Sequence, residues 1–116
     1  MLGEADVVAV AAPLTAATAG MLGADEFAAM KCGVLYVNVS RGAIAQEAAL
    51  LDALQRGHVA GAGLDVFAVE PLPAGHPLTT LENVTLSAHS AFRTPEASEN
   101  LISAAWEHCR RIAKGA

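Results

Sequence analysis

The sequence of 116 residues contains few charged and few aromatic side chains. Charged residues make up 16% and aromatic residues 4% of the chain, whereas hydrophobic residues make up 53%. This composition excludes an intrinsically disordered chain, because disorder requires low hydrophobicity and high charge. The length suits one domain with one core. The shortage of aromatic residues predicts that aliphatic side chains and alanine fill that core.

Several features that identify other classes of protein are also missing. The formal net charge is −5 and no basic run occurs, so the chain lacks the positive patch that nucleic-acid binding needs. No apolar run approaches the roughly 20 residues of a membrane span. The first residues, MLGEADVV, lack the basic and apolar regions of a signal peptide. We therefore expect a cytoplasmic protein that binds neither nucleic acid nor a membrane.

Cysteine is scarce and does not indicate a metal site. The chain has two cysteines, Cys32 and Cys109, which lie far apart and lack the spacing of metal ligands. Such a pair fits a reducing compartment, in which both thiols stay free. We expect no bound metal.

Short β-branched runs alternate along the chain with stretches rich in alanine and leucine. We expect strands over residues 5–11, 34–39, 59–67 and 83–89, and helices over residues 24–30, 46–57 and 94–113. The first strand is apolar enough to be buried on both faces. Gly61 and Gly63, in the third strand, suggest close packing of a helix on its face. The alternation of strands and helices with short loops predicts an α/β fold with a parallel sheet.

Residues that begin or end helices support these boundaries. Arg56 and Gly57 suit the last turn and the stop of the second helix. Thr94 is a good N-cap for the third helix, Pro95 fits its first position, and an acidic residue follows at position 96. Gly33 is expected to stop the first helix.

Four chemically active side chains lie where strands of the predicted sheet end. Arg41 follows the second strand and His89 ends the fourth. Asp65 lies at the end of the third strand, and Glu70 lies just beyond it. In open α/β sheets, ligands bind beyond the carboxyl ends of the strands. Each residue alone has a structural alternative: a surface ion pair, a histidine with its bonds satisfied, an acid that binds loop amides, or a solvated turn residue. Together on one rim they favour a functional site.

These residue types suit the transfer of a proton and a hydride. His89 can exchange a proton near neutral pH. Glu70, bonded to the other ring nitrogen, would fix the tautomer and favour the imidazolium. Arg41 would hold a carboxylate and polarise the neighbouring carbonyl. This chemistry interconverts a 2-hydroxy acid and a 2-oxo acid, with a nicotinamide carrying the hydride.

Longer motifs add a family resemblance that covers nearly the whole chain. They are, in order, ADVVAVAAPLTAATAGML, NVSRG, GAGLDVFAVEPLP, HPLTTLENVTLSAH and TPEA. Their order and spacing resemble the D-isomer-specific 2-hydroxyacid dehydrogenase family. The resemblance implies half of a Rossmann-like doubly wound domain, with about four parallel strands and flanking helices. It also implies NAD or NADP as cofactor and a small 2-hydroxy or 2-oxo acid as substrate.

The resemblance implies a role for individual residues. Arg41 resembles the arginine that binds the substrate carboxylate, His89 the catalytic histidine, and Glu70 the acid that supports it. Asp65 resembles the acid on the nicotinamide carboxamide side. The residues that resemble cofactor contacts are Ala12, Pro13, Val39, Ser40, Arg41, Asp65, His89, Ser90 and Ala91.

The chain departs from the family pattern around the histidine. Ala88 stands where the family usually has proline, and AFRT occupies residues 91–94, where smaller residues are common. Phe92 and Arg93 could narrow the pocket or change its charge. The sequence therefore does not determine which side chain the substrate carries.

The glycine-rich fingerprint G-x-G-x-x-G and the acid about 20 residues after it are absent, as is a substrate domain. We therefore expect residues 1–116 to form a single partial NAD(P)-binding domain. We expect this chain alone to be inactive, because a helix N-terminus normally holds the pyrophosphate and a closed cleft excludes water. The apolar strand at residues 6–10 would lie at a sheet edge, which predicts a homodimer, a larger assembly or a complementing chain.

Two alternatives remain open from the sequence. The first is a non-catalytic nucleotide-binding or corepressor-like interaction module built on the same fold. The second is a structural half-domain whose rim residues are idle.

Overall fold

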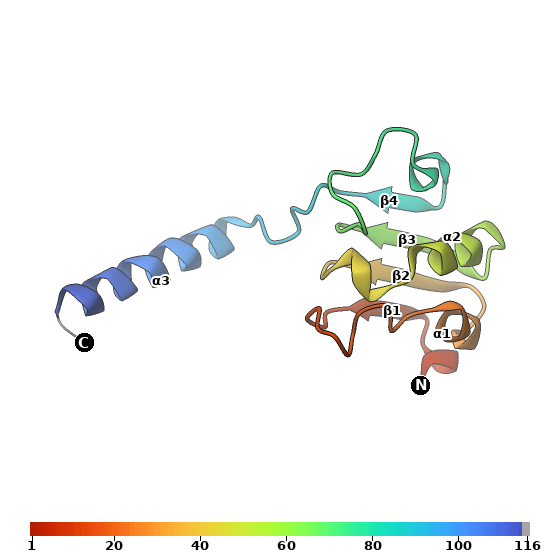
Figure 1. Ribbon diagram of the computed structural model, residues 1–116, viewed down its shortest axis with the longest axis horizontal. Helices are drawn as coiled ribbons and strands as arrows, with labels where there is room; N and C mark the ends of the chain where they lie inside the picture. The colour runs from red at the N-terminus through yellow and green to blue at the C-terminus, as the bar shows by residue number, and fades with distance from the viewer. Residues whose placement is uncertain (115–116) are drawn as a thin grey trace.

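The fold is built on a four-stranded sheet, described by a computed structural model over residues 1–114 (Figure 1). The strands are β1 (Val7–Val10), β2 (Val34–Asn38), β3 (Val59–Leu64) and β4 (Val84–Leu86), adjacent in that order and all parallel. Val10 pairs with Asn38, and Asn38 pairs with Leu64. Leu64 in turn pairs with Leu86. The register therefore aligns the carboxyl ends of the four strands along one edge, and it confirms the predicted α/β fold.

Two helices, α1 (Ala24–Ala29) and α2 (Glu47–Gln55), form the core with one face of the sheet. Alternate residues of β2, Val34 and Tyr36, are fully buried toward them. Tyr36 packs edge-to-face on Phe27 of α1, with ring centroids 5.4 Å apart, and burial raises the pKa of its hydroxyl to about 12. Apart from this pair the large buried side chains are aliphatic, as the composition predicts; they include Ile44, Leu50, Leu54, Val59 and Leu78. Each contributes about 1.5–3 kcal/mol by leaving water.

The helix ends follow the local sequence, with one difference. Arg56 is the C-cap of α2 and pairs with Asp52 at 2.6 Å, and Gly57 ends the helix at φ +70°, a conformation that suits glycine. The first helix stops at Ala29, before Gly33, which instead adopts φ +86° in the turn that enters β2. Short 3₁₀ turns, η1 (Leu2–Glu4), η2 (Gly42–Ile44) and η3 (Pro77–Thr80), complete the connections.

The opposite face of the sheet is largely open within residues 1–114. Leu35 of β2 is 49% exposed and Val7 of β1 is 54% exposed. The prediction that the first strand is buried on both faces is therefore wrong, since only Val10 in β1 is buried. Gly61 and Gly63 line a shallow groove on this open face together with Leu35. No described helix packs on them, so the predicted reason for these glycines is also wrong.

The last helix, α3 (Pro95–Ala113), extends away from the sheet on the side of the strand carboxyl ends (Figure 1). Its predicted N-terminus is confirmed, because the Thr94 hydroxyl accepts a hydrogen bond from the Ala97 amide at 3.1 Å. None of its described residues is buried, and Leu101 and Trp106 are about two-thirds exposed. No helix within residues 1–114 is long and apolar enough to cross a membrane.

Candidate active site

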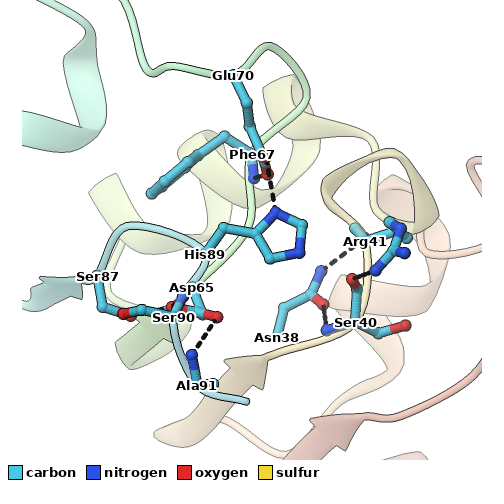
Figure 2. Close-up of polar contacts among 10 residues, drawn as sticks. All are labelled: Asn38, Ser40, Arg41, Asp65, Phe67, Glu70, Ser87, His89, Ser90 and Ala91. Carbon is cyan, nitrogen blue, oxygen red and sulfur yellow. Dashed lines mark hydrogen bonds and ion pairs between the residues drawn. The ribbon is translucent and has the colours of Figure 1, made fainter. Parts of the chain in front are cut away.

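Three of the four residues identified from the sequence meet around one cleft beyond the strand carboxyl ends (Figure 2). The cleft has a volume of about 280 Å³. Its lining consists of Leu14, Arg41, Gly42, Ala43, Phe67, Ala68, Glu70 and His89. These residues come from the segments that follow β1, β2, β3 and β4. The parallel order of the strands therefore brings together segments that are distant in sequence.

His89 and Glu70 form a hydrogen-bonded pair at this cleft. Nδ1 of His89 lies 2.7 Å from Oε2 of Glu70, while the other carboxylate oxygen accepts the Phe67 amide at 3.0 Å. The hydrogen bond from His89 lowers the pKa of Glu70, and the Phe67 amide and the nearby charges of His89 and Arg41 lower it further. An ionised carboxylate only accepts hydrogen bonds, so Nδ1 is the donor. Nε2 is left available to a ligand.

Asp65 lies beside this pair and holds the loop that carries His89. Its carboxylate is buried and accepts hydrogen bonds from the Ser87 hydroxyl, the Ser90 amide at 2.8 Å and the Ala91 amide at 2.9 Å. The hydrogen bond from Ser87 has the largest effect in lowering the pKa of Asp65, and the bonds from the two amides lower it further. The Asp65 carbonyl also accepts the His89 amide at 2.8 Å.

The backbone of His89 has φ +50°, in the left-handed region that residues with side chains seldom adopt. The bonds to Asp65 lie on both sides of this position and keep the loop in its conformation. Asp65 therefore binds loop amides, which is one of the structural alternatives that the sequence allowed for the rim residues. The same loop aims the imidazole at the cleft.

Arg41 has no acidic partner within residues 1–114. Its Nη1 donates to the carbonyl of the neighbouring Ser40 at 2.7 Å, and none of the described ion pairs includes it. A guanidinium offers five donors, most of which therefore remain available at the cleft. This arrangement matches a site for an anionic ligand and not a permanent internal ion pair.

Gly42 allows the turn of Arg41 to rest on the chain that leads to Glu70. A Cβ atom on Gly42 would lie 2.1 Å from the carbonyl carbon of Phe67 and 2.5 Å from the amide nitrogen of Ala68. Only glycine permits such a close approach between two backbones. This contact holds the turn of Arg41 against the segment that leads to Glu70.

The residues that resemble cofactor contacts do not all lie in one place. Val39, Asp65 and Ala91 line a second, shallow cleft of about 200 Å³ beside the open face of the sheet. Ser40 donates its hydroxyl hydrogen bond to the carbonyl of Ala12, which ties the ends of β1 and β2 together.

Of the remaining residues of that set, Arg41 and His89 line the first cleft, whereas Pro13 and Ser90 line neither of the two clefts. The Pro13 carbonyl accepts the Thr18 hydroxyl at 2.7 Å, and the Ser90 amide is bonded to Asp65. Phe92 is 64% exposed, and neither its side chain nor that of Arg93 lines these two clefts. That these two residues narrow the substrate pocket or change its charge stays a prediction.

Two further features were missed by the sequence analysis. Asn38, at the end of β2, is buried and bonded across the turn of Arg41. A second pair joins His76 and Glu47, with Nε2 and Oε1 3.0 Å apart, and neither residue lines the two clefts described above. No group of three or more histidine, cysteine or acidic side chains among the described residues is arranged to hold a metal ion.

The fold and the rim define an α/β domain of the dinucleotide-binding class, with its polar groups at the carboxyl ends of parallel strands. Residues 1–91 match the family model described as "D-isomer specific 2-hydroxyacid dehydrogenase, NAD binding domain", and the chain belongs to this family. The resemblance found in the sequence is thereby confirmed.

Individual relatives agree with this assignment. The chain is 44% identical over 105 residues to glyoxylate/hydroxypyruvate reductase B of Salmonella gallinarum, which covers 90% of this chain and 32% of the relative. A D-isomer specific 2-hydroxyacid dehydrogenase from Lactobacillus delbrueckii ssp. bulgaricus, solved in its NAD complex, superposes with a TM-score of 0.90 at 34% identity and covers 99% of this chain and 39% of that one.

A third relative is a D-isomer specific 2-hydroxyacid dehydrogenase from Xanthobacter autotrophicus Py2, solved in complex with NADPH and MES. It superposes with a TM-score of 0.74 at 45% identity, and the match covers 76% of this chain and 29% of the relative. The chain thus spans about a third of the length of the curated relatives it matches.

Proposed function

We propose that the chain supplies the catalytic rim of an NAD(P)-dependent 2-hydroxyacid dehydrogenase. The observation that carries this proposal is that the Arg41 guanidinium, which forms no ion pair within residues 1–114, lies at the same cleft as a histidine whose Nδ1 is held by a carboxylate. The family assignment and the names of the relatives support it. The substrate is a small 2-hydroxy or 2-oxo acid, since the cleft combines one cationic group with small and apolar neighbours.

Each residue of the cleft has a separate task in this reaction. Arg41 binds the substrate carboxylate and draws electron density from the adjacent carbonyl. Nε2 of His89 gives a proton to the carbonyl oxygen during reduction and takes it back from the hydroxyl during oxidation. Glu70 accepts the bond from Nδ1, which keeps the ring oriented and stabilises the imidazolium while the proton is present. The cofactor, when bound, supplies or receives the hydride.

The second cleft is the proposed place for the nicotinamide side of NAD or NADP. Val39 and Ala91 offer apolar contact, and one oxygen of Asp65 accepts a single described bond, so it retains capacity for a carboxamide N–H. Ala12, Pro13, Ser40 and Ser90 belong to the same rim and are proposed as cofactor contacts, with Arg41 and His89 reaching across from the first cleft.

We also propose that the chain is inactive alone and acts in an assembly, as a homodimer or with a complementing chain. His89 and Glu70 are 39% and 36% exposed, so water reaches the reacting groups. Turnover of a 2-oxo acid with NADH at about 1 s⁻¹ or faster by the purified chain would contradict this. Both cysteines are free and exposed, which fits the proposed cytoplasmic setting.

The proposed function is tested by NMR titration of the ¹⁵N-labelled chain, first with NADH and then with oxamate, an unreactive analogue of a 2-oxo acid. We expect shifts that centre on the residues of the two clefts, and loss of the oxamate response in Arg41→Gln. Arg56→Gln is the matched control, because Arg56 lies in a surface ion pair with Asp52. No response to either ligand at millimolar concentration would refute the proposal.

A further inference from the structure

Asn38 is a buried polar residue with no role in the chemistry proposed above. It is the last residue of β2 and is 2% exposed. Its backbone carbonyl accepts the amide of Asp65 at 3.0 Å, which joins the ends of β2 and β3. A buried polar side chain is costly unless its hydrogen bonds are satisfied, so the partners of the Asn38 amide indicate its purpose.

The side chain of Asn38 bridges the turn that carries Arg41 (Figure 2). Oδ1 accepts the backbone amide of Ser40 at 3.0 Å, and Nδ2 donates to the backbone carbonyl of Arg41 at 3.0 Å. Nδ2 also lies 3.4 Å from the hydroxyl of the buried Tyr36. A backbone amide can only donate and a carbonyl can only accept, so the orientation of the Asn38 amide is determined by its partners.

No other side chain of this size offers a donor and an acceptor on one rigid plane. Aspartate would place an oxygen against the Arg41 carbonyl, and leucine would leave both backbone groups without a partner. The turn has one further constraint, the contact of Gly42 with the backbone at Phe67. Between these two contacts the main chain of Arg41 has little freedom.

We propose that Asn38 is a positioning residue that fixes the backbone of Arg41, so that the guanidinium is already in place for the substrate carboxylate. This inference rests on the proposed function of Arg41. Arginine has a long side chain, and its carboxylate affinity depends on how much of its motion is removed before the ligand arrives. Asn38 acts on the start of that side chain without touching the ligand.

The test compares Asn38→Asp and Asn38→Ala with the wild-type chain by ¹⁵N relaxation and amide hydrogen exchange. We expect protection of the Ser40 amide to be lost and the order parameters of Ser40 and Arg41 to fall from about 0.85 toward 0.6. Asn83→Asp is the matched control, because the side chain of Asn83 makes only long hydrogen bonds, of 3.4 and 3.5 Å, just before β4 at the opposite end of the sheet.

Ser40 and Arg41 that stay as rigid and as protected as in the wild type would overturn the inference. Asn38→Ala serves this purpose if the buried charge of Asn38→Asp prevents folding. Oxamate binding gives the second readout: we expect a loss of about tenfold in the Asn38 variants and none in Asn83→Asp. Equal binding by wild type and folded Asn38 variants also counts against the inference, whereas a wild-type chain that binds no oxamate counts against the proposed function of Arg41.

Discussion

At the scale of single residues, the bond between His89 and Glu70 determines which ring nitrogen faces a ligand. Nδ1 donates to an ionised carboxylate whose pKa is lowered by that bond, so Nε2 is directed to the cleft. The second pair, between His76 and Glu47, uses Nε2 for its carboxylate instead. The two histidines therefore bond to their carboxylates through different ring nitrogens, and only the pair of His89 and Glu70 lines the first cleft.

Removal of Glu70 is expected to release the His89 ring. In Glu70→Ala, Nδ1 has no described acceptor, so the ring should exchange between its tautomers, and ¹⁵N spectra of the side chain should show this as averaged nitrogen shifts. Glu47→Ala removes the carboxylate of His76 and should leave the His89 resonances unchanged. A His89 ring that keeps its proton on Nδ1 in Glu70→Ala would show that Glu70 does not orient it.

Asp65 predicts how stability changes with pH. Its native pKa is lowered from 3.8, chiefly by the Ser87 hydroxyl, so in acid the unfolded chain binds more protons than the folded chain. The free energy of unfolding should therefore be highest above pH 4 and fall as pH is lowered through the native pKa. Urea unfolding between pH 3 and 6 measures the slope.

Asp65→Asn is the variant that assigns this slope. An asparagine has no titrating group, so the dependence on pH should become shallower, although the carboxylates of Glu70 and Asp6, whose pKa values are also lowered, retain their part. The variant should be less stable at pH 6, because its amide can accept fewer of the loop hydrogen bonds. An unchanged slope would mean that Asp65 does not titrate differently on folding.

At the scale of elements, the turn η2 is placed by contact between two backbones. Gly42→Ala puts a Cβ atom 2.1 Å from the Phe67 carbonyl carbon, so the turn has to move away from the segment that leads to Glu70. We expect a loss of about 1–3 kcal/mol in the free energy of unfolding, as for other overpacked sites. Urea denaturation measures it.

Gly63→Ala is the matched control for this prediction. A Cβ atom there would meet Val37 at 3.9 Å, an ordinary contact on the open face of the sheet. We expect a change within about 0.5 kcal/mol. Equal losses in the two variants would show that the contact at Gly42 does not determine the turn.

The third and fourth strands are shorter than predicted, because the chain leaves the sheet where it forms the loop that carries His89. β3 ends at Leu64 and β4 at Leu86, whereas the predicted strands continue to residues 67 and 89. The amides of Ser87 and His89 still donate to backbone carbonyls of the neighbouring segment. The next two amides, of Ser90 and Ala91, donate to the carboxylate of Asp65 instead. Apolar patterns reveal which segments are buried, but they do not reveal where a side chain replaces the sheet hydrogen bonds.

At the scale of the whole molecule, apolar surface remains uncovered on the sheet. β1 is an edge strand, and Val7 is about half exposed. We expect light scattering to show a mass above that of the monomer at high protein concentration, because such an edge pairs with other chains. Val7→Lys should shift the mass toward the monomer.

Val69→Lys is the control for the effect of an added charge, since Val69 is 63% exposed and lies outside β1. Val69→Lys should leave the mass of the assembly unchanged. A wild-type chain that remains a monomer at every concentration would remove the basis for the proposed assembly.

The sequence by itself determined the order of the elements and the rim on which the site lies. Strand and helix periods are local properties, and parallel strands joined by crossovers place their carboxyl ends on one edge. Hence the segments after the strands, with Arg41, Glu70 and His89, could be placed at one edge before the structure was known.

Only the tertiary structure decided which groups bond to one another. Asp65 could have faced a ligand, yet its oxygens mainly hold the loop of His89; Asn38 could have been an ordinary strand residue, yet it spans the turn of Arg41. Hydrogen-bond partners depend on the strand register, and a shift of a few tenths of an ångström between segments far apart in sequence can make or break a bond. Local residue patterns carry no information on those distances, because they emerge only when the strands pack side by side.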